Sequence, residues 1–170
     1  WYNTTANTLK SYGMQGAGAW ASAGALTVAR YYGQGVGTQT AALCVSGDPY
    51  PTTPAYSVLV ESYNGSTWTE IADVSVGRKT ASGGMGTQTA CIVGCAQSAP
   101  GYAPVVMEEY NGTSWSESAD INSGRSYSGN SVAGTITACQ IGGGGNTAAD
   151  HGALTETFNG TAWTEVGDLN

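Results

Sequence analysis

Charged residues are scarce in this sequence, and basic ones are the scarcest. Only 10% of its 170 residues are charged, with five lysines and arginines against twelve aspartates and glutamates. The net charge of -7 argues against nucleic-acid binding, because proteins of that class present a basic face to the phosphates. It argues equally against a polybasic patch that would hold an anionic membrane surface.

Histidine and long apolar runs are also almost missing. The single histidine, His151, cannot supply the ligands of a zinc or copper centre or complete a Ser-His-Asp triad. The four cysteines follow no zinc-binding spacing. No apolar stretch reaches the length that spans a bilayer. We therefore predict no metal, no other cofactor and no membrane insertion.

Glycine and other small residues fill much of the chain instead. Glycine occurs 26 times and phenylalanine once, with many threonines, alanines and serines between them. Strong helix formers are few, whereas threonine and the other β-branched residues are common. This composition predicts an all-β fold.

A motif of about 48 residues recurs along the chain. Four tryptophans follow one another at intervals of 48, 47 and 48 residues. An aromatic residue stands five positions before each of the last three, and an arginine stands ten positions after each of the first three. These positions are the tryptophans Trp20, Trp68, Trp115 and Trp163, the aromatic residues Tyr63, Tyr110 and Phe158, and the arginines Arg30, Arg78 and Arg125.

Each repeat divides into four short strands. In the middle complete repeat we expect them near residues 78–86, 87–94, 105–110 and 114–119. An Asn-Gly pair precedes the fourth strand at Asn64, Asn111 and Asn159, and it favours a type I′ hairpin turn. The inner strands carry small residues, which suits sheets that converge on an axis and have neighbours on both faces. Four-stranded units at this period are typical of a β-propeller.

The repeats predict about three and a half propeller blades with four-stranded antiparallel sheets. A partial blade made of the two outer strands falls at 1–28, and complete blades fall at 29–75, 76–122 and 123–170. Propellers have about four to eight blades, so this number cannot close a ring. Every sheet face is expected to need burial. We therefore expect further copies of the chain, or more of the same polypeptide, to close the propeller.

The repeat resembles that of the kelch β-propellers. A kelch unit has an arginine before its first strand, a double glycine after its second, and then a tyrosine and a tryptophan. The matching positions are Arg78, Tyr110 and Trp115, then Arg125, Phe158 and Trp163, with the double glycine kept only at Gly142 and Gly143. The resemblance implies a propeller. It implies little about function, because kelch propellers include enzymes, adaptors and viral or surface proteins.

The repeated charged and aromatic residues are interpreted as structural. We expect the arginines to bind Asp73, Asp120 or nearby carbonyl groups rather than a substrate carboxylate. The glutamates of the third strand are expected on an exposed face. They are not expected to be catalytic, because a catalytic pair needs two different environments. Each tryptophan should pack between its own blade and the next. The glutamates are Glu61, Glu108 and Glu156.

Three loops between the second and third strands differ most among the repeats, at 48–57, 96–104 and 146–153. Such variable loops often form the binding face of a repeat protein, although they can also vary because nothing constrains them. Tyrosine offers contact area together with a hydroxyl group. The candidate binding residues are Tyr50, Tyr56, Tyr102 and His151. Candidate N-glycosylation sites are Asn3, Asn64, Asn111 and Asn159.

We interpret the chain as a non-catalytic structural or recognition module that binds protein or glycan, and a resemblance to kelch-like surface repeats implies that it belongs to a virion, fibre or cell surface. Its lysine-poor, threonine- and glycine-rich sequence is similar to kelch-like repeats of viral tail or surface-fibre proteins and of bacterial surface proteins. This similarity implies an extracellular or virion location. Two alternatives remain open: a fragment of a glycan-active propeller enzyme, and an intracellular kelch-type adaptor.

We predict that all four cysteines are free thiols. Cys91 and Cys95 lie four apart in an expected strand, which separates them by about 13 Å, whereas a disulfide needs Cα atoms within about 7 Å. Cys91 and Cys139 occupy equivalent positions in adjacent repeats, about 10 Å apart if sheets pack face to face. Mass spectrometry of the unreduced chain, alkylated after unfolding, should show every cysteine modified. A crosslink between Cys91 and Cys139 would contradict the proposed register.

Overall fold

The described residues of the computed structural model form strands and turns and contain no helix, as the composition predicted. The structure describes the backbone at residues 2–3 and 8–9. It describes backbone and side chains at residues 22–51, 56–79, 83–98, 105–126, 132–145 and 152–169. A short hairpin pairs β1 (Tyr2–Asn3) with β2 (Thr8–Leu9).

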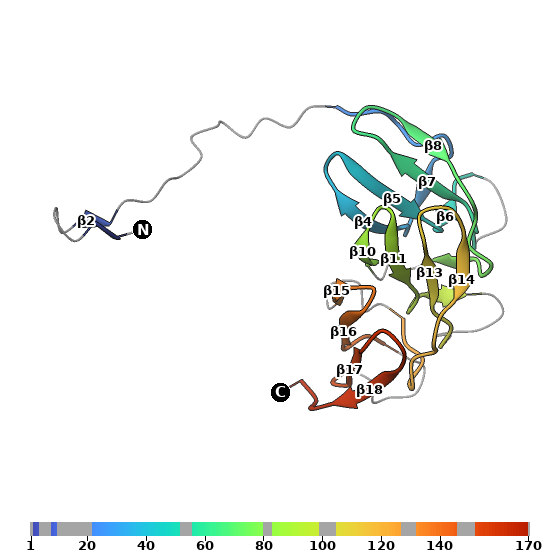
Figure 1. Ribbon diagram of the computed structural model, residues 1–170. Coiled ribbons are helices and arrows are strands. Elements are labelled where there is room, and N and C mark those ends of the chain that lie inside the picture. Colours follow the sequence, from blue (N-terminus) through green and yellow to red (C-terminus); the bar gives the residue numbers. More distant parts are fainter. Residues whose placement is uncertain are drawn as a thin grey trace.

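Three four-stranded antiparallel sheets form the body of the molecule, one for each complete repeat (Figure 1). The first sheet comprises β4 (Gln34–Thr38), β5 (Ala41–Val45), β7 (Val60–Tyr63) and β8 (Trp68–Glu70). The second comprises β10 (Met85–Thr87), β11 (Ala90–Val93), β13 (Glu108–Tyr110) and β14 (Trp115–Glu117). The third comprises β15 (Val132–Thr135), β16 (Ala138–Gly142), β17 (Thr155–Phe158) and β18 (Trp163–Val166).

The residues around each arginine form a small pairing of their own. β3 (Arg30–Tyr31) pairs with β6 (Asp48–Pro49), and β9 (Arg78–Lys79) pairs with β12 (Gln97–Ser98). Ser126 forms a single bridge to Gly145 at the equivalent place. The main first strands, β4, β10 and β15, follow the arginine as predicted, whereas the arginine segment itself pairs with residues that follow the second strand.

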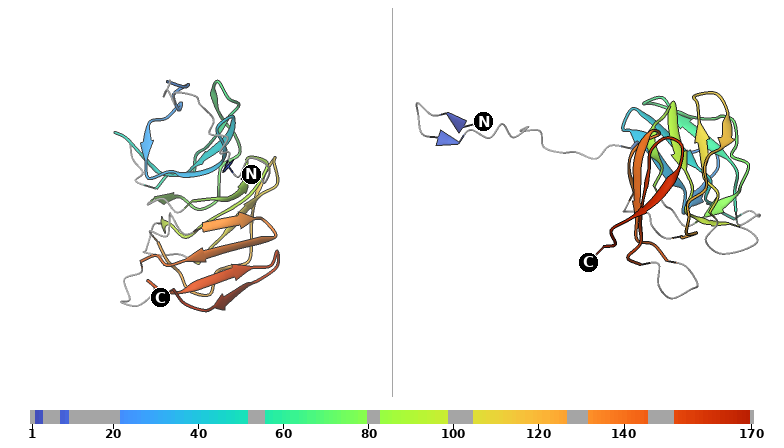
Figure 2. Two further views of the ribbon diagram at one scale, coloured as in Figure 1. Left: turned by 90° about the vertical axis from the view of Figure 1, so that its left-hand side faces the viewer. Right: turned by 60° about the horizontal axis from the view of Figure 1, so that its bottom comes forward.

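The sheets stand in a row in chain order, and their first strands are neighbours (Figure 2). β10 of the second sheet lies against β4 on one side and β15 on the other. The Gly84 amide donates to the Gly35 carbonyl oxygen at 3.1 Å across the first junction. A Cβ atom on Gly84 would stand 2.9 Å from the Val36 Cβ, so this approach requires glycine. The small residues of the inner strands therefore serve close contact between sheets.

Two apolar clusters fill the spaces between the sheets. We call the side of a sheet that looks toward the next repeat its following face, and the opposite side its preceding face. The following face of the first sheet meets the preceding face of the second through Val36, Leu43, Val45, Val60, Val74, Cys91, Val93 and Tyr110. The second and third sheets meet through Met85, Ile92, Met107, Ile121, Cys139, Ile141, Phe158 and Trp163.

The following face of the third sheet departs from this pattern. Exposed Gln140 stands where the first two sheets have buried Leu43 and Ile92, as the strand registers show. Thr155 likewise replaces Val60 and Met107. The central positions of this face therefore carry polar side chains, whereas those of the two inner following faces are apolar.

The Asn-Gly hairpins between third and fourth strands are confirmed, but their turn type is not. At the first hairpin Tyr63 pairs with Trp68, and the Asn64 Oδ1 accepts hydrogen bonds of 2.9 Å from the amides of Ser66 and Thr67. Only Gly65 has a positive φ, of 92°, whereas a type I′ turn needs it at both central residues. The asparagine side chain holds the loop instead. Asn111 and Asn159 do the same.

The tryptophans bind the chain that arrives from the preceding repeat. The Trp115 Nε1 donates to the Ala72 carbonyl at 2.9 Å, and the Trp163 Nε1 donates to that of Ala119 at 3.0 Å. Each ring also packs on the aromatic residue paired with it, at 4.8 to 5.0 Å between centroids. The tryptophans therefore have a structural role, as predicted. The prediction that each packs against the next repeat is wrong, because each binds the preceding one. Trp20 lies outside the described residues.

All four cysteines lie among the described residues, and none forms a disulfide. Burial raises the pKa of Cys91 and of Cys95 to about 12 and that of Cys139 to about 11. Cys44 on the preceding face of the first sheet is only half-buried. These thiols act as small apolar residues in the core.

Trp163→Ala should destabilise the protein by about 3 to 5 kcal/mol, the usual cost of truncating a buried aromatic residue. Trp163 is 6% exposed and lies in the second apolar cluster. Thr69→Ala provides the control, because Thr69 is exposed on the outer strand of the first sheet, and it should cost clearly less. Denaturant unfolding measures both changes. Equal losses for the two variants would contradict a role for Trp163 in joining two sheets.

Candidate functional site

Each repeated arginine forms a buried ion pair with the glutamate of its own third strand. The pairs are Arg30 with Glu61, Arg78 with Glu108 at 2.5 Å, and Arg125 with Glu156. All six side chains are at most 1% exposed. The prediction that the glutamates lie on an exposed face is therefore wrong. Alternation explains their burial, since each glutamate shares a face with the buried aromatic residue two positions later.

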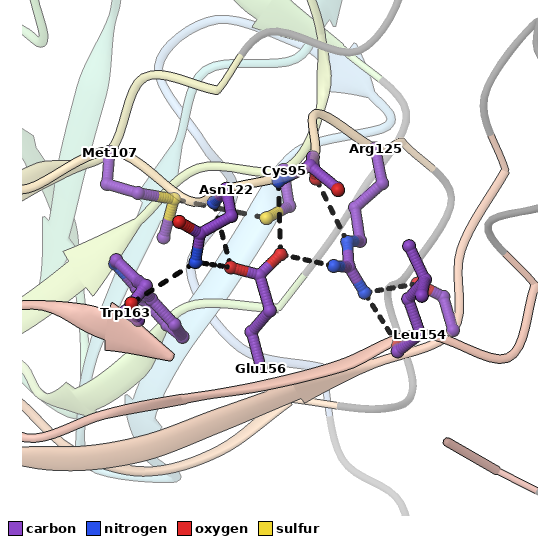
Figure 3. A network of polar contacts seen from close by, with 9 residues as sticks. Cys95, Met107, Asn122, Arg125, Leu154, Glu156 and Trp163 are labelled. Carbon is purple, nitrogen blue, oxygen red and sulfur yellow. Dashed lines mark hydrogen bonds and ion pairs between the residues drawn. The ribbon is translucent and has the colours of Figure 1, made fainter. Parts of the chain in front are cut away.

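The glutamate carboxylates also bind the chain that arrives from the preceding repeat, as Figure 3 shows for the third sheet. The Glu156 carboxylate accepts hydrogen bonds from the amides of Asn122 at 2.8 Å and Ser123 at 3.2 Å. The Asn122 side chain donates to the same carboxylate and to the Trp163 carbonyl oxygen. Glu61 and Glu108 bind the equivalent amides of Thr27, Val28, Ser75 and Val76.

The guanidinium groups are held by backbone carbonyls as well as by the glutamates. Arg125 donates to the carbonyl oxygens of Leu154 at 2.7 Å, Gly143 at 3.3 Å and Ser123 at 3.2 Å. Binding to carbonyls was predicted and is confirmed. The predicted aspartate partner is wrong for the first repeat, where Asp73 instead accepts from the Val60 amide at 3.3 Å.

These contacts give the repeated glutamates and arginines a structural role. Every carboxylate among them is buried, paired with a cation and bonded to two backbone amides. In this state it offers no exposed oxygen to a substrate. The same environment recurs in three repeats, so no two of these carboxylates are set apart as acid and base.

The loop end of the first sheet carries exposed tyrosines beside a buried aspartate, Asp48, which is 8% exposed. The β3–β6 pairing places Tyr31 opposite Asp48, whereas the equivalent pairs are Lys79 with Gln97 and Ser126 with Gly145. β7 begins after the loop at residues 48–57 and ends at the Asn64 hairpin. The loop and the hairpin therefore lie at opposite ends of the first sheet. We call the group the tyrosine cluster. Its members are Tyr31, Tyr32, Asp48, Tyr50, Tyr56 and Lys79.

The tyrosine cluster presents aromatic rings around one carboxylate. Tyr31, Tyr32 and Tyr50 are 47%, 55% and 70% exposed. The rings of Tyr31 and Tyr32 meet edge to face, with centroids 4.9 Å apart. The Lys79 Nζ lies 3.5 Å from the Asp48 Oδ2 and 4.8 Å from the centre of the Tyr56 ring.

Backbone geometry and electrostatics both mark this cluster. Tyr32 has a φ of 61°, a left-handed conformation that costs energy for a residue with a bulky side chain. Partial loss of hydration, followed by the nearby Asp48 carboxylate, raises the pKa of Tyr31. The Tyr31 hydroxyl also forms a hydrogen bond with this carboxylate. The Tyr50 amide donates to the Ala29 carbonyl at 3.0 Å, which ties the loop to the sheet.

Two of the four predicted binding residues, Tyr50 and Tyr56, belong to this cluster. Tyr102 and His151 lie outside the described residues. Sequence reasoning missed Tyr31, Tyr32, Asp48 and Lys79. A comparison of the first position after each arginine would have found Tyr31, because Lys79 and Ser126 stand there in the other repeats. The second position is less distinctive, since Tyr127 of the third repeat stands where the first has Tyr32. Of the candidate glycosylation sites, Asn64, Asn111 and Asn159 are exposed, and only the backbone of Asn3 is described.

No protein-family model and no curated protein matches the chain. Among the described residues no group of three metal-binding side chains comes together. The described part of the chain also has no helix of the length and hydrophobicity that crossing a membrane requires.

The Glu61 ion pair should make stability depend on acid pH. Burial raises the pKa of Glu61, but hydrogen bonds from Thr27, Arg30 and Val28 outweigh it and hold the pKa below its ordinary value. The unfolded chain therefore binds the proton more readily. The stabilising contribution is present above the ordinary carboxyl range, about pH 4, and is lost as the pH falls through the lower folded-state value.

Denaturant unfolding between neutral and acid pH tests this dependence. Glu61→Gln should be less stable near neutrality and should lose less stability on acidification, because it lacks the titrating group. Glu70→Gln, on the exposed outer strand of the same sheet, serves as the control. Parallel pH profiles for wild type and Glu61→Gln would refute the assignment.

Proposed function

We propose that this chain is a segment of a β-propeller and serves as a non-catalytic recognition module of a virion, fibre or cell surface. In this proposal the tyrosine cluster binds carbohydrate. The observation that carries it is the set of exposed tyrosines around Asp48, which departs from the repeat at the loop end of the first sheet.

The propeller arrangement is supported by the equivalence of the three sheets. Each brings a small-residue strand to the inner side of the row and repeats the same arginine–glutamate contact. Continuing the row with the same rotation between neighbours would bring further sheets around a common axis. Propellers close with about four to eight such units.

Carbohydrate suits the chemistry of the cluster. Exposed tyrosine rings offer flat apolar faces for the C–H groups of a sugar ring, and they lose little conformational entropy on binding because they have two χ angles. Tyrosine hydroxyls can exchange hydrogen bonds with sugar hydroxyls, while Asp48, which is 8% exposed and lies 3.5 Å from the Lys79 Nζ, supports the Tyr31 side chain from beneath. The negative net charge disfavours acidic glycans. We therefore favour a neutral oligosaccharide as the ligand.

A recognition role is favoured over catalysis by the use of the repeated carboxylates. Glu61, Glu108 and Glu156 each engage an arginine and two amides, so they are not available as acid, base or nucleophile. Asp48 stands alone as a carboxylate in the tyrosine cluster, whereas most glycosidases use two. Binding without turnover is the behaviour expected of this arrangement.

Tyr50→Ala should weaken glycan binding at least tenfold, equivalent to about 1.4 kcal/mol, because it removes the most exposed ring of the cluster. Tyr32→Ala should act in the same direction. Val166→Ala is the control, since Val166 is 40% exposed on the outer strand of the third sheet. Binding and turnover are measured on a panel of labelled neutral and acidic oligosaccharides. Absence of binding throughout the panel, or wild-type affinity in both tyrosine variants, would overturn the proposal.

A further inference from the structure

One glutamine joins the first two sheets by three hydrogen bonds. Gln88 lies in the turn between β10 and β11 and reaches across to the preceding sheet. Its Nε2 lies 2.6 Å from the Tyr63 carbonyl oxygen, 2.9 Å from the Ser62 Oγ and 3.2 Å from the Ala42 carbonyl oxygen. The second sheet thus inserts a polar side chain into an acceptor group on the following face of the first.

The first sheet presents the same glutamine to solvent. Gln39 lies between β4 and β5 in the sequence Thr-Gln-Thr, which is identical to the sequence around Gln88. The registers of the two hairpins make Gln39 and Gln88 equivalent. Gln39 is exposed, and by this equivalence it points toward whatever precedes the first sheet. The third sheet has Ile136 at this position.

The third sheet presents a matching acceptor group at the other end of the row. The register makes Cys139, Thr157 and Phe158 equivalent to Ala42, Ser62 and Tyr63. Thr157 keeps the hydroxyl group of Ser62, whereas the second sheet has Glu109 there. A hollow on this part of the third sheet is lined by Ala133, Gly134, Ala138, Cys139, Gln140, Thr157 and Phe158.

Other residues of the two end faces fit the same pairing. Gln140 replaces the Leu43 and Ile92 of the other following faces. By equivalence with the inner junctions it would meet Ala42 and half-buried Cys44 of an approaching first sheet. The larger polar side chain thus faces small residues. The Thr155 Oγ1 on the same face is buried and has no hydrogen-bond partner among the described residues.

We propose that two copies of this chain associate head to tail, the following face of the third sheet of one copy receiving the first sheet of the other. Gln39 then enters the hollow and donates to the Thr157 hydroxyl and to the carbonyl oxygens of Cys139 and Phe158. Two copies joined at both ends form a ring of about six sheets, within the range for propellers. The inference rests on the inner junctions and is independent of the carbohydrate proposal.

Two single variants, each blocking one face, test this interface. Gln39→Arg places a charge on the first sheet, and Gln140→Arg places one on the third. Both positions are exposed, so neither change disturbs the core. Thr113→Arg, in the exposed hairpin of the middle sheet, is the matched control. Light scattering and sedimentation report the mass, and unfolding curves verify that every variant is folded.

The wild type and Thr113→Arg should have about twice the 17.2 kDa mass of the chain. Each single-face variant alone should be a folded monomer. An equimolar mixture of the two should regain a dimer, because each partner retains the face that the other has lost. A monomeric wild type, undiminished assembly in both variants, or a mixture that stays monomeric would overturn the proposal. Glycan binding by the monomeric variants keeps this result separate from the carbohydrate test.

Discussion

The buried ion pair between an arginine and a glutamate is the contact on which the row of sheets depends. Burying two charges is costly, and the cost is met only when hydrogen bonds satisfy both groups. Here each carboxylate receives the guanidinium and two backbone amides from the chain leaving the preceding repeat. Each third strand is thereby tied to its neighbour. Removing one partner of such a pair commonly costs about 3 to 5 kcal/mol, since the other charge stays buried.

The same periodicity separates structural residues from candidate functional ones. Arginine, glutamate and tryptophan recur because each junction between sheets has the same geometry and needs the same contacts. A binding site for a ligand, by contrast, has to be formed in only one of the repeats. Tyr31 and Asp48 interrupt the repeat at a place where the structure exposes aromatic rings, whereas the most repeated residues are buried. In a repeat protein of this kind, departure from the repeat is the stronger indication of a binding site.

The sequence predicted the strand order, the hairpin positions and the small-residue inner strands, because each follows from local period and turn chemistry. It misplaced Glu108, since a strand buried on both faces has no polar side by which alternation could be read. The predicted type I′ turn was wrong, because hydrogen bonds to the Asn64 side chain hold the loop and Asn64 does not take a positive φ. Four of the six residues of the tyrosine cluster were missed, because pairing of β3 with β6 joins residues outside the four main strands.

The polar residues on the end faces of the row would make the proposed assembly specific. An exposed apolar sheet face invites unspecific association. Gln140 and Thr155 make the following face of the third sheet more polar than the two inner ones, which lowers that risk before a partner arrives. In the proposed dimer, polar groups would also enforce alignment, because a shifted register would bury the Gln39 amide without its acceptors and forfeit about 1 to 3 kcal/mol for each unsatisfied group. The inner junctions need less discrimination, since the chain itself fixes their neighbours.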